Sequence, residues 1–174
     1  MPSGKKNLQA ADLSTLLEGL SEAGIEFIVV GGLAAVAQGA PVTTFDLDIV
    51  HHQNDENIKK LLNFLKSIDA HQRRPDDKII EPTKEDFKGK GHVLLKTRYG
   101  PLDVLAFIEK GRGFKELLPN TVEIELQGYK VYVLSLDTLI DLKRDSKDPR
   151  DRYRLPILEE TLRQIREKAK SKNE

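Results

Sequence analysis

The chain contains no cysteine, so disulfide bridges, thiolate metal sites and cysteine nucleophiles are all excluded. It also lacks an apolar stretch of the roughly 18 residues that a membrane-spanning helix needs. Its first residues contain no apolar segment typical of a signal peptide. We therefore expect a soluble, cytoplasmic protein that does not engage a membrane.

Neither sign of charge is in excess, because 28 Lys and Arg residues balance 28 Asp and Glu residues. No global basicity indicates nucleic-acid binding, although a local basic patch is compatible with this balance. A Walker-type Gly-x-x-x-x-Gly-Lys loop and a nucleophile elbow are both missing. P-loop chemistry and a hydrolase triad are therefore not indicated.

The apolar periodicity predicts a mixed α/β (α+β) fold, with a short mixed β-sheet, helices packed on it and a small C-terminal helical part. We expect residues 1–174 to form one domain, with an αβ core at about 1–134 and C-terminal helices at about 135–174. Strands are predicted at 26–30, 45–50, 92–99, 101–108, 121–126 and 129–134. Three helices are predicted to begin at side-chain caps: from Asn7 to about 23, from Asn54 to about 70, and after Ser135. Further helices are predicted at 31–38, at 113–118 and from Pro149 onwards. Pro156 is expected to kink or restart the last one. Residues 72–90 are expected to form a loop with some local helix, and the charged chain from about Glu167 is expected to fray.

The most informative segment is 27–50, FIVVGGLAAVAQGAPVTTFDLDIV. Residues two apart in a strand point to the same face, so Asp46 and Asp48 are expected to project together while Leu47 and Ile49 enter the core. Two adjacent carboxylates repel each other, and burying them unpaired is costly. Such a pair usually holds a cation, and oxygen ligands suit Mg²⁺ or Mn²⁺.

Two further features complete a candidate site. Gly31 and Gly32 stand where a strand ends and a helix begins, a place where the backbone can approach a phosphate closely. A third acid, Asp103, lies in an otherwise apolar strand, where a lone carboxylate is costly unless something draws it there. If that strand neighbours the Asp46 strand, the three acids converge, and two metal ions there could hold a triphosphate.

These residues resemble the nucleotidyltransferase superfamily that shares the palm fold of DNA polymerase β. The family pattern is a glycine turn, a spacer, an acid-x-acid strand and a third acid on a later strand. Here it is matched by Gly31-Gly32, thirteen intervening residues, Asp46-Leu47-Asp48 and Asp103. The sequences of residues 27–50 and 131–158 look most like those of small prokaryotic nucleotidyltransferases related to AbiEii-type toxins.

The resemblance implies transfer of a nucleoside monophosphate from an NTP to an acceptor, with release of pyrophosphate. It implies that Asp46 and Asp48 bind both metal ions and that Asp103 holds the catalytic one and helps to deprotonate the acceptor hydroxyl. It also implies that Gly31 and Gly32 contact the triphosphate and that Lys143 reaches a phosphate or structures the site. The acceptor is left open among a tRNA end, a protein hydroxyl and a small molecule.

One position departs from the family. Relatives often carry Arg four positions before the first acid, and this chain has Val42 there. This departure makes plausible a rival function, namely a catalytically silent NTP-binding or regulatory module. A second rival, independent of Val42, is a toxin–antitoxin component whose main role is association with a cognate antitoxin protein.

Each feature also has a structural interpretation. The glycine pair alone fits tight strand–helix packing, Asp103 alone fits an exposed edge strand, and Lys143 fits a solvated cation at a helix C-terminus. His51 and His52 are expected at the surface, because consecutive strand residues point opposite ways and cannot easily share a metal. The basic segments 88–92 and 110–115 are expected to be solvated turns, the alternative being that they steer an NTP or an RNA acceptor toward the acids.

Overall fold

The computed structural model describes residues 12–172. Its strands are β1 (Phe27–Val30), β2 (Leu47–His51), β3 (His71–Gln72), β4 (His92–Thr97), β5 (Gly100–Leu105), β6 (Thr121–Leu126) and β7 (Tyr129–Leu134). Its helices are α2 (Leu13–Glu22), α3 (Gly31–Ala37), α4 (Asp55–Ser67), α5 (Lys84–Lys88), α6 (Phe114–Leu117), α7 (Leu136–Arg144) and α8 (Pro149–Lys172), with short 3₁₀ turns η2 (Glu109–Gly111) and η3 (Leu118–Asn120). The Asn7 cap predicted for the first helix lies outside the described residues.

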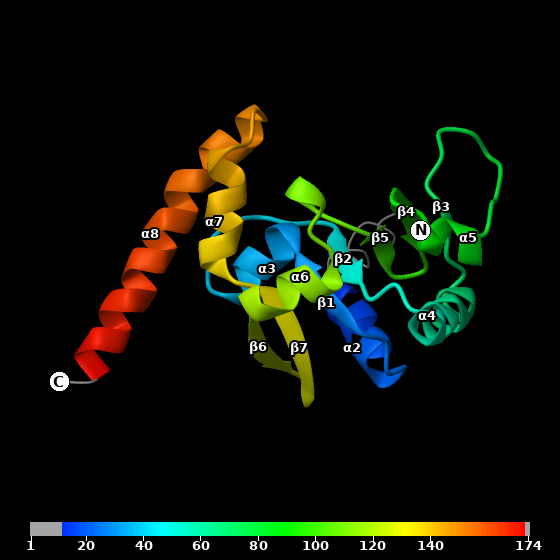
Figure 1. Cartoon of the computed structure of the whole chain (residues 1–174), viewed down its shortest axis with the longest axis horizontal. Coiled ribbons are helices and arrows are strands. Elements are labelled where there is room, and N and C mark those ends of the chain that lie inside the picture. The colour runs from blue at the N-terminus through cyan, green and yellow to red at the C-terminus, as the bar shows by residue number, and fades with distance from the viewer. Residues whose placement is uncertain (1–11, 173–174) are drawn as a thin grey trace, which may run out of the picture.

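The strands form one mixed sheet in the order β3-β4-β5-β2-β1-β7-β6 (Figure 1). β2 pairs antiparallel with β1 and parallel with β5, while β1 pairs parallel with β7. The two predicted hairpins, β4–β5 and β6–β7, are both present. The predicted mixed α/β fold is therefore confirmed, and its central parallel pair sets the position of the acids, since Asp48 lies directly opposite Asp103.

Helices bury apolar stripes against this sheet. The stripe of α2, whose leucines recur at helical spacing, is buried as expected at Leu13, Leu16, Leu17 and Leu20. α2 packs against β7 and α4, and α3 packs against β1, β2 and α7. The Asn54 side chain caps α4 by accepting from the backbone N–H of Asn57 at 2.8 Å, as its position in the sequence predicts.

The middle of the chain differs in detail from the expected loop. Residues 72–90 begin with the end of β3, and they contain α5, whose start is fixed by a capping box between Thr83 and Asp86. The predicted strand 101–108 ends at Leu105, because the chain turns there into η2. The predicted strand 45–50 begins at Leu47, which leaves Asp46 just before β2, and it runs one residue further, to His51.

This extension overturns the expectation that His51 lies at the surface. His51 is only 2% exposed, because the last residue of β2 is covered by α5. Its two ring nitrogens lie 3.1 Å from the carbonyl oxygens of Leu105 and Phe87. Burial lowers the pKa of His51, although the two carbonyl oxygens favour the protonated ring.

The C-terminal part consists of α7 and α8, which pack against each other. Ser135 caps α7 by accepting from the Thr138 N–H at 3.3 Å. α8 runs through Pro156 without restarting and continues past Glu167 to Lys172, so the expected fraying is not seen. Arg163 stabilises this end by pairing with Glu160 and Glu167 one turn away on either side. Figure 1 shows α8 leaving the body of the protein toward the C-terminus.

Within residues 12–172, no helix is both long enough and apolar enough to cross a membrane. The division of the chain at about residue 134 stays a prediction.

Candidate functional site

The centre of the site is a pair of carboxylates on neighbouring parallel strands. Asp48 of β2 and Asp103 of β5 are register partners, so their side chains lie on the same face of the sheet. The Oδ1 atom of Asp48 is buried and has no hydrogen-bond partner among residues 12–172. Burial raises the pKa of Asp48 to about 7, and Asp103 and Asp46 act in the same direction. The pair is therefore a site where ionising Asp48 is costly, because Asp48 is buried and a second carboxylate lies beside it.

An arginine that was not anticipated from the sequence partly neutralises the charge of this carboxylate pair. Arg73 follows β3 and is held at the sheet edge by its backbone N–H, which donates to the carbonyl of Leu94 at 2.9 Å. Its guanidinium forms an ion pair with Asp103 and acts to lower the pKa of Asp48. Arg73 belongs to a polar stretch with no apolar period, so the sequence carries no signal that it reaches Asp103 on β5, two strands from β3 in the sheet.

Asp46 lies close enough for its charge to be felt by Asp48, but it is exposed and precedes β2. Thr44 holds the backbone there, because its hydroxyl donates to the Asp46 carbonyl oxygen at 3.2 Å. Among the described residues, no three acidic or histidine side chains are grouped closely enough to hold one metal ion. The structure thus brings Asp48 and Asp103 together, and a three-acid metal site that includes Asp46 stays a prediction.

The pair nevertheless has the donor chemistry that a divalent ion needs. Asp48 offers an unpartnered, buried carboxylate oxygen, and Asp103 offers a carboxylate whose partner is a cation. Hard ions such as Mg²⁺ or Mn²⁺ prefer oxygen ligands of this kind. The chemistry of Asp48 and Asp103 therefore fits such an ion, and their role as metal ligands stays a prediction.

The glycine turn lies directly against Asp48. Gly31 has a φ of +69°, and a Cβ added to it would come within 3.0 Å of the Asp48 Oδ2 atom. A Cβ on Gly32 would lie 3.0 Å from the Thr44 hydroxyl and 3.6 Å from the Nη1 atom of Arg154. Any larger side chain at Gly31 would thus displace the carboxylate, and this is the close approach that requires glycine. Because Gly31 and Gly32 have no side chains, the turn can pack tightly against Asp48 and Thr44, and it also leaves room for a phosphate to approach the backbone.

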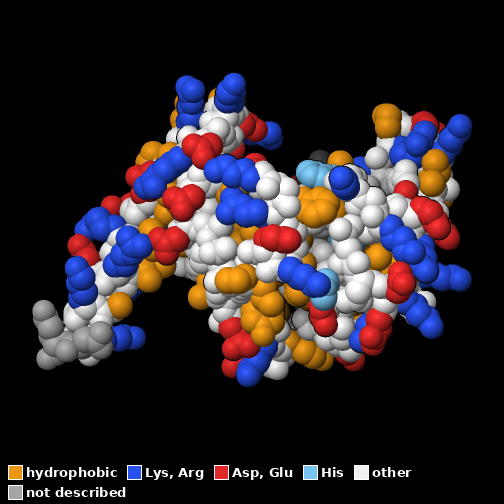
Figure 2. All heavy atoms as spheres, in the orientation of Figure 1, with side chains coloured by type: hydrophobic (Ala, Val, Ile, Leu, Met, Phe, Trp, Pro, Cys, Tyr) orange, Lys and Arg blue, Asp and Glu red, His pale blue; other side chains and the backbone are white. Residues whose placement is uncertain are grey.

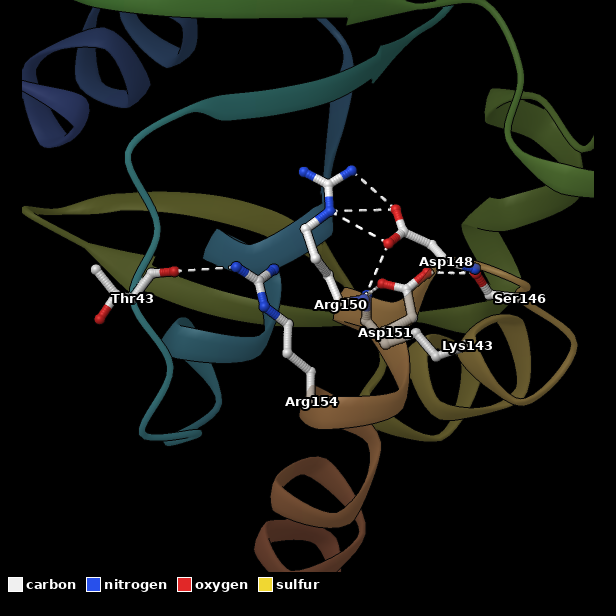
Figure 3. A network of polar contacts seen from close by, with 7 residues as sticks. All are labelled: Thr43, Lys143, Ser146, Asp148, Arg150, Asp151 and Arg154. Carbon is white, nitrogen blue, oxygen red and sulfur yellow. Dashed lines mark hydrogen bonds and ion pairs between the residues drawn. The ribbon is translucent and has the colours of Figure 1, made fainter.

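A cavity of about 410 Å³ opens beside this turn, and we call it the arginine cavity. The cavity is lined on one side by Gly32 and residues 43–46, and Asp48 also lines it. Its other side is formed by Asp148, which precedes α8, and by Arg150, Asp151 and Arg154 in the first turns of α8. Figure 3 shows Arg150 paired with Asp148 at 2.8 Å and Arg154 donating to the Thr43 carbonyl oxygen at 3.3 Å. Two guanidinium groups therefore lie on one side of the acids, where sequence reasoning placed none.

Lys143 lies next to this cavity, in a partly buried ion pair. Its Nζ atom is 2.9 Å from Asp151 Oδ1, and its side chain is 16% exposed (Figure 3). Burial acts to raise the pKa of Asp151, but hydrogen bonds from Ser146 and Lys143 outweigh it, so this pKa lies below its usual range. Lys143 and Asp151 line a smaller cavity of about 160 Å³ that also reaches Gly31 and Asp48. Lys143 is thus not a fully solvated cation, and its role as a nucleotide ligand stays a prediction.

The other candidates lie elsewhere. The Nδ1 atom of His52 lies 2.5 Å from the accepting carboxylate of Glu26, and its ring stacks on Phe114 at 4.7 Å, at the opposite end of β2 from Asp48. In the basic segments, Lys88 pairs with Asp55 at 3.4 Å and Lys110 with Asp145 at 3.8 Å. Both contacts are on the surface, as expected for solvated turns.

No protein-family model matches the sequence, and a comparison with curated proteins finds no match. Solved structures do match. The lincomycin-bound lincosamide antibiotic adenylyltransferase LnuA is 14% identical, with 86% of this chain and 95% of that one covered and a TM-score of 0.55. An antigenic nucleotidyltransferase-like protein from Paracoccidioides brasiliensis is 16% identical, with coverage of 88% and 76% and a TM-score of 0.56. ANT(2'')-Ia in complex with adenylyl-2''-tobramycin is 16% identical, with coverage of 86% and 88% and a TM-score of 0.53. The chain therefore has the nucleotidyltransferase fold.

Proposed function

We propose that the protein is a metal-dependent nucleotidyltransferase that moves a nucleoside monophosphate from an NTP to an acceptor hydroxyl and releases pyrophosphate. The observation that carries the proposal is the carboxylate pair Asp48 and Asp103, held side by side on parallel strands. Asp48 also lines a cavity that is shared by Gly32, Arg150 and Arg154. The shared fold with two antibiotic adenylyltransferases supports the same class of reaction.

In this proposal the arginine cavity receives the triphosphate. The guanidinium groups of Arg150 and Arg154 offer hydrogen bonds and charge to phosphate oxygens. Gly31 and Gly32 leave room for phosphates beside Asp48, and Lys143 adds a cation at the edge of the site. Catalysis would rest mainly on positioning and charge neutralisation, because phosphoryl-type transfer asks little covalent work of the protein.

Asp48 and Asp103, joined by Asp46, would hold Mg²⁺ or Mn²⁺. Such an ion neutralises triphosphate charge and makes a coordinated hydroxyl more acidic. The acceptor oxygen then forms a bond to the α-phosphorus, the bond from that phosphorus to the bridging oxygen breaks, and pyrophosphate leaves with the electron pair. Asp103 accepts the hydroxyl proton. Before the reaction, Arg73 has to release Asp103, because its guanidinium occupies that carboxylate.

The alternative is a catalytically silent NTP-binding or regulatory module, and Val42 favours it. Val42 is a partly buried residue that packs on the core where relatives often carry Arg. In this chain, however, the Arg154 guanidinium reaches the carbonyl of the neighbouring residue, Thr43. We propose that Arg154 supplies from α8 the positive charge that the family places four positions before the first acid, which supports the active enzyme.

Transfer is tested by incubating the pure protein with Mg²⁺, each α-labelled NTP in turn and a cell extract. We expect label on one macromolecule or metabolite, and loss of labelling in Asp48→Asn and Asp103→Asn. Glu123→Gln is the matched control, because it removes an exposed acid on the distant strand β6. Binding of NTP by the wild type without any label transfer or pyrophosphate release would establish the silent alternative instead.

The likeness to AbiEii-type toxins adds a role in the cell. We propose that the protein arrests growth when produced alone and that a cognate antitoxin protein relieves the arrest. Arrest by the wild type and not by Asp48→Asn would support a toxin that acts through this site. Unimpaired growth with abundant folded protein would exclude the toxin role and leave the transferase proposal standing.

A further inference from the structure

A second large cavity lies on the other side of the acids, and the proposed function assigns it no role. It has a volume of about 410 Å³ and lies between the segment that follows β3 and the turn that joins β4 to β5. We call it the loop cavity. Figure 2 shows the upper outline of the protein hollowed between the tip of α7 and α8 on one flank and the loop after β3 on the other. The arginine cavity is lined from the first flank and the loop cavity from the second.

Strand register places the loop cavity beside the carboxylates. Pro101, which lines the cavity, is two residues from Asp103 on β5, so both lie on the same face of the sheet. Lys96 of β4 is the register partner of Pro101 and also lines the cavity. Arg73 connects the loop cavity to the carboxylate pair directly, because it lines the cavity and its guanidinium pairs with Asp103. Asp103 therefore links the two cavities, because it lies beside Asp48, which lines the arginine cavity, and pairs with Arg73, which lines the loop cavity.

The charges of the loop cavity are mainly positive. Four cationic side chains line it, against two acidic ones: Arg73, Arg74, Lys78 and Lys96 against Asp76 and Asp77. Arg74 is held by Asp76 through two contacts of 2.7 and 2.8 Å. Lys78 and Lys96 form no ion pair within residues 12–172. In Figure 2 the projecting loop carries blue side chains interspersed with red and orange ones.

We propose that the loop cavity is the acceptor site and that it selects an acceptor carrying a phosphate group near its attacking hydroxyl. This inference rests on the proposed transferase function. Lys78 and Lys96 would hold the phosphate, and Arg73 would join them once Asp103 is taken up by a divalent ion. The hydroxyl oxygen then bonds to the α-phosphorus of the NTP, pyrophosphate leaves, and the proton passes to Asp103. A cationic acceptor would meet repulsion from these unpaired lysines.

Calorimetry in the presence of Mg²⁺ and a saturating α,β-methylene analogue of ATP tests the proposal, because the analogue fills the arginine cavity. The small probes share one sugar and differ in charge: glucose 6-phosphate, glucose and glucosamine. A short single-stranded RNA with a free 3′ hydroxyl is the polymeric phosphate probe. The variants are Lys78→Glu and Lys96→Glu, with Lys130→Glu as the control on the far strand β7. Far-UV circular dichroism verifies that each variant is folded.

We expect a phosphate probe to bind the wild type and to lose affinity about tenfold or more in Lys78→Glu and Lys96→Glu, but not in Lys130→Glu. Binding of glucose 6-phosphate would identify a small phosphorylated acceptor, and binding of RNA alone would identify a polynucleotide end. Preference for glucosamine, no binding of either phosphate probe, or equal loss in the control would overturn the inference. The ATP, GTP, CTP and UTP forms of the analogue are measured first, and failure of all four to bind would instead refute the proposed function.

Discussion

Replacing Asp48 by asparagine keeps the size of the side chain and removes its ability to ionise. In the wild type, burial and the neighbouring carboxylates raise the pKa of Asp48 from 3.8 to about 7. A carboxyl group with a higher pKa in the folded than in the unfolded protein binds more protons when folded. Its contribution to stability is therefore complete at low pH and is lost as the pH rises from about 4 to about 7.

The size of this effect follows from the two pKa values. At pH 5 the folded protein holds the proton on Asp48 while the unfolded chain has mostly released it, and at pH 8 both states have released it. The free energy of unfolding of the wild type should thus fall by about 3 kcal/mol between pH 5 and pH 8, relative to Asp48→Asn, which does not titrate. Groups that do not interact with Asp48, including the buried His51, titrate in both proteins and cancel in the difference.

Urea unfolding of both proteins at pH 5 and pH 8, without divalent ions, measures this difference, with Glu123→Gln as the control for the loss of an exposed acid. We expect Asp48→Asn to be the more stable protein at pH 8 and to lose that advantage at pH 5. Added Mg²⁺ should stabilise the wild type at pH 8 more than at pH 5 and should have little effect on the variant. A wild type whose stability relative to Asp48→Asn stays constant or rises with pH would refute this reasoning.

Three other substitutions test separate parts of the site. Gly31→Ala should lower the free energy of unfolding by about 2 kcal/mol or more and weaken ATP binding. Gly39→Ala is the control, because Gly39 is also at positive φ but has open space around it, so only the backbone strain should lower its stability. Urea unfolding compares the two variants. Lys143→Met leaves Asp151 partly buried without its cation and should cost about 2 kcal/mol, and an NMR titration should show the Asp151 pKa moving up. His51→Leu removes the ring contacts with the Leu105 and Phe87 carbonyl oxygens, of which the second still accepts from Gln53, and should cost about 1 kcal/mol. An unchanged melting temperature would contradict the buried contacts.

Short-range sequence patterns predict much of the fold. The leucine spacing of α2, the Asn54 and Ser135 caps and the two hairpins are short-range features, because each depends on residues a few positions apart. The least accurate predictions lie where contacts are distant. His51 reads as one more residue of a polar pair, and it is buried because α5, formed more than thirty residues later, covers the end of β2.

The same distinction applies to the candidate site. Asp48 and Gly31 belong to one segment, so their spacing already indicates a carboxylate beside a tight turn. Arg154 reaches the Thr43 carbonyl across 111 residues and Arg73 reaches Asp103 across 30, and neither lies in a motif that the sequence marks. Their positions follow from how α8 and the β3 edge pack, which depends on the whole core.

By itself, the sequence determined the acids, the glycine turn and the alternation that makes a mixed sheet, since these depend on residue chemistry and short-range period. The tertiary structure alone decided that β2 and β5 are parallel neighbours in a register that places one acid opposite the other. It also decided which cations face those acids from each side. Strand order and helix docking are set by the combined burial of distant apolar surfaces, and a single stretch of chain does not encode them.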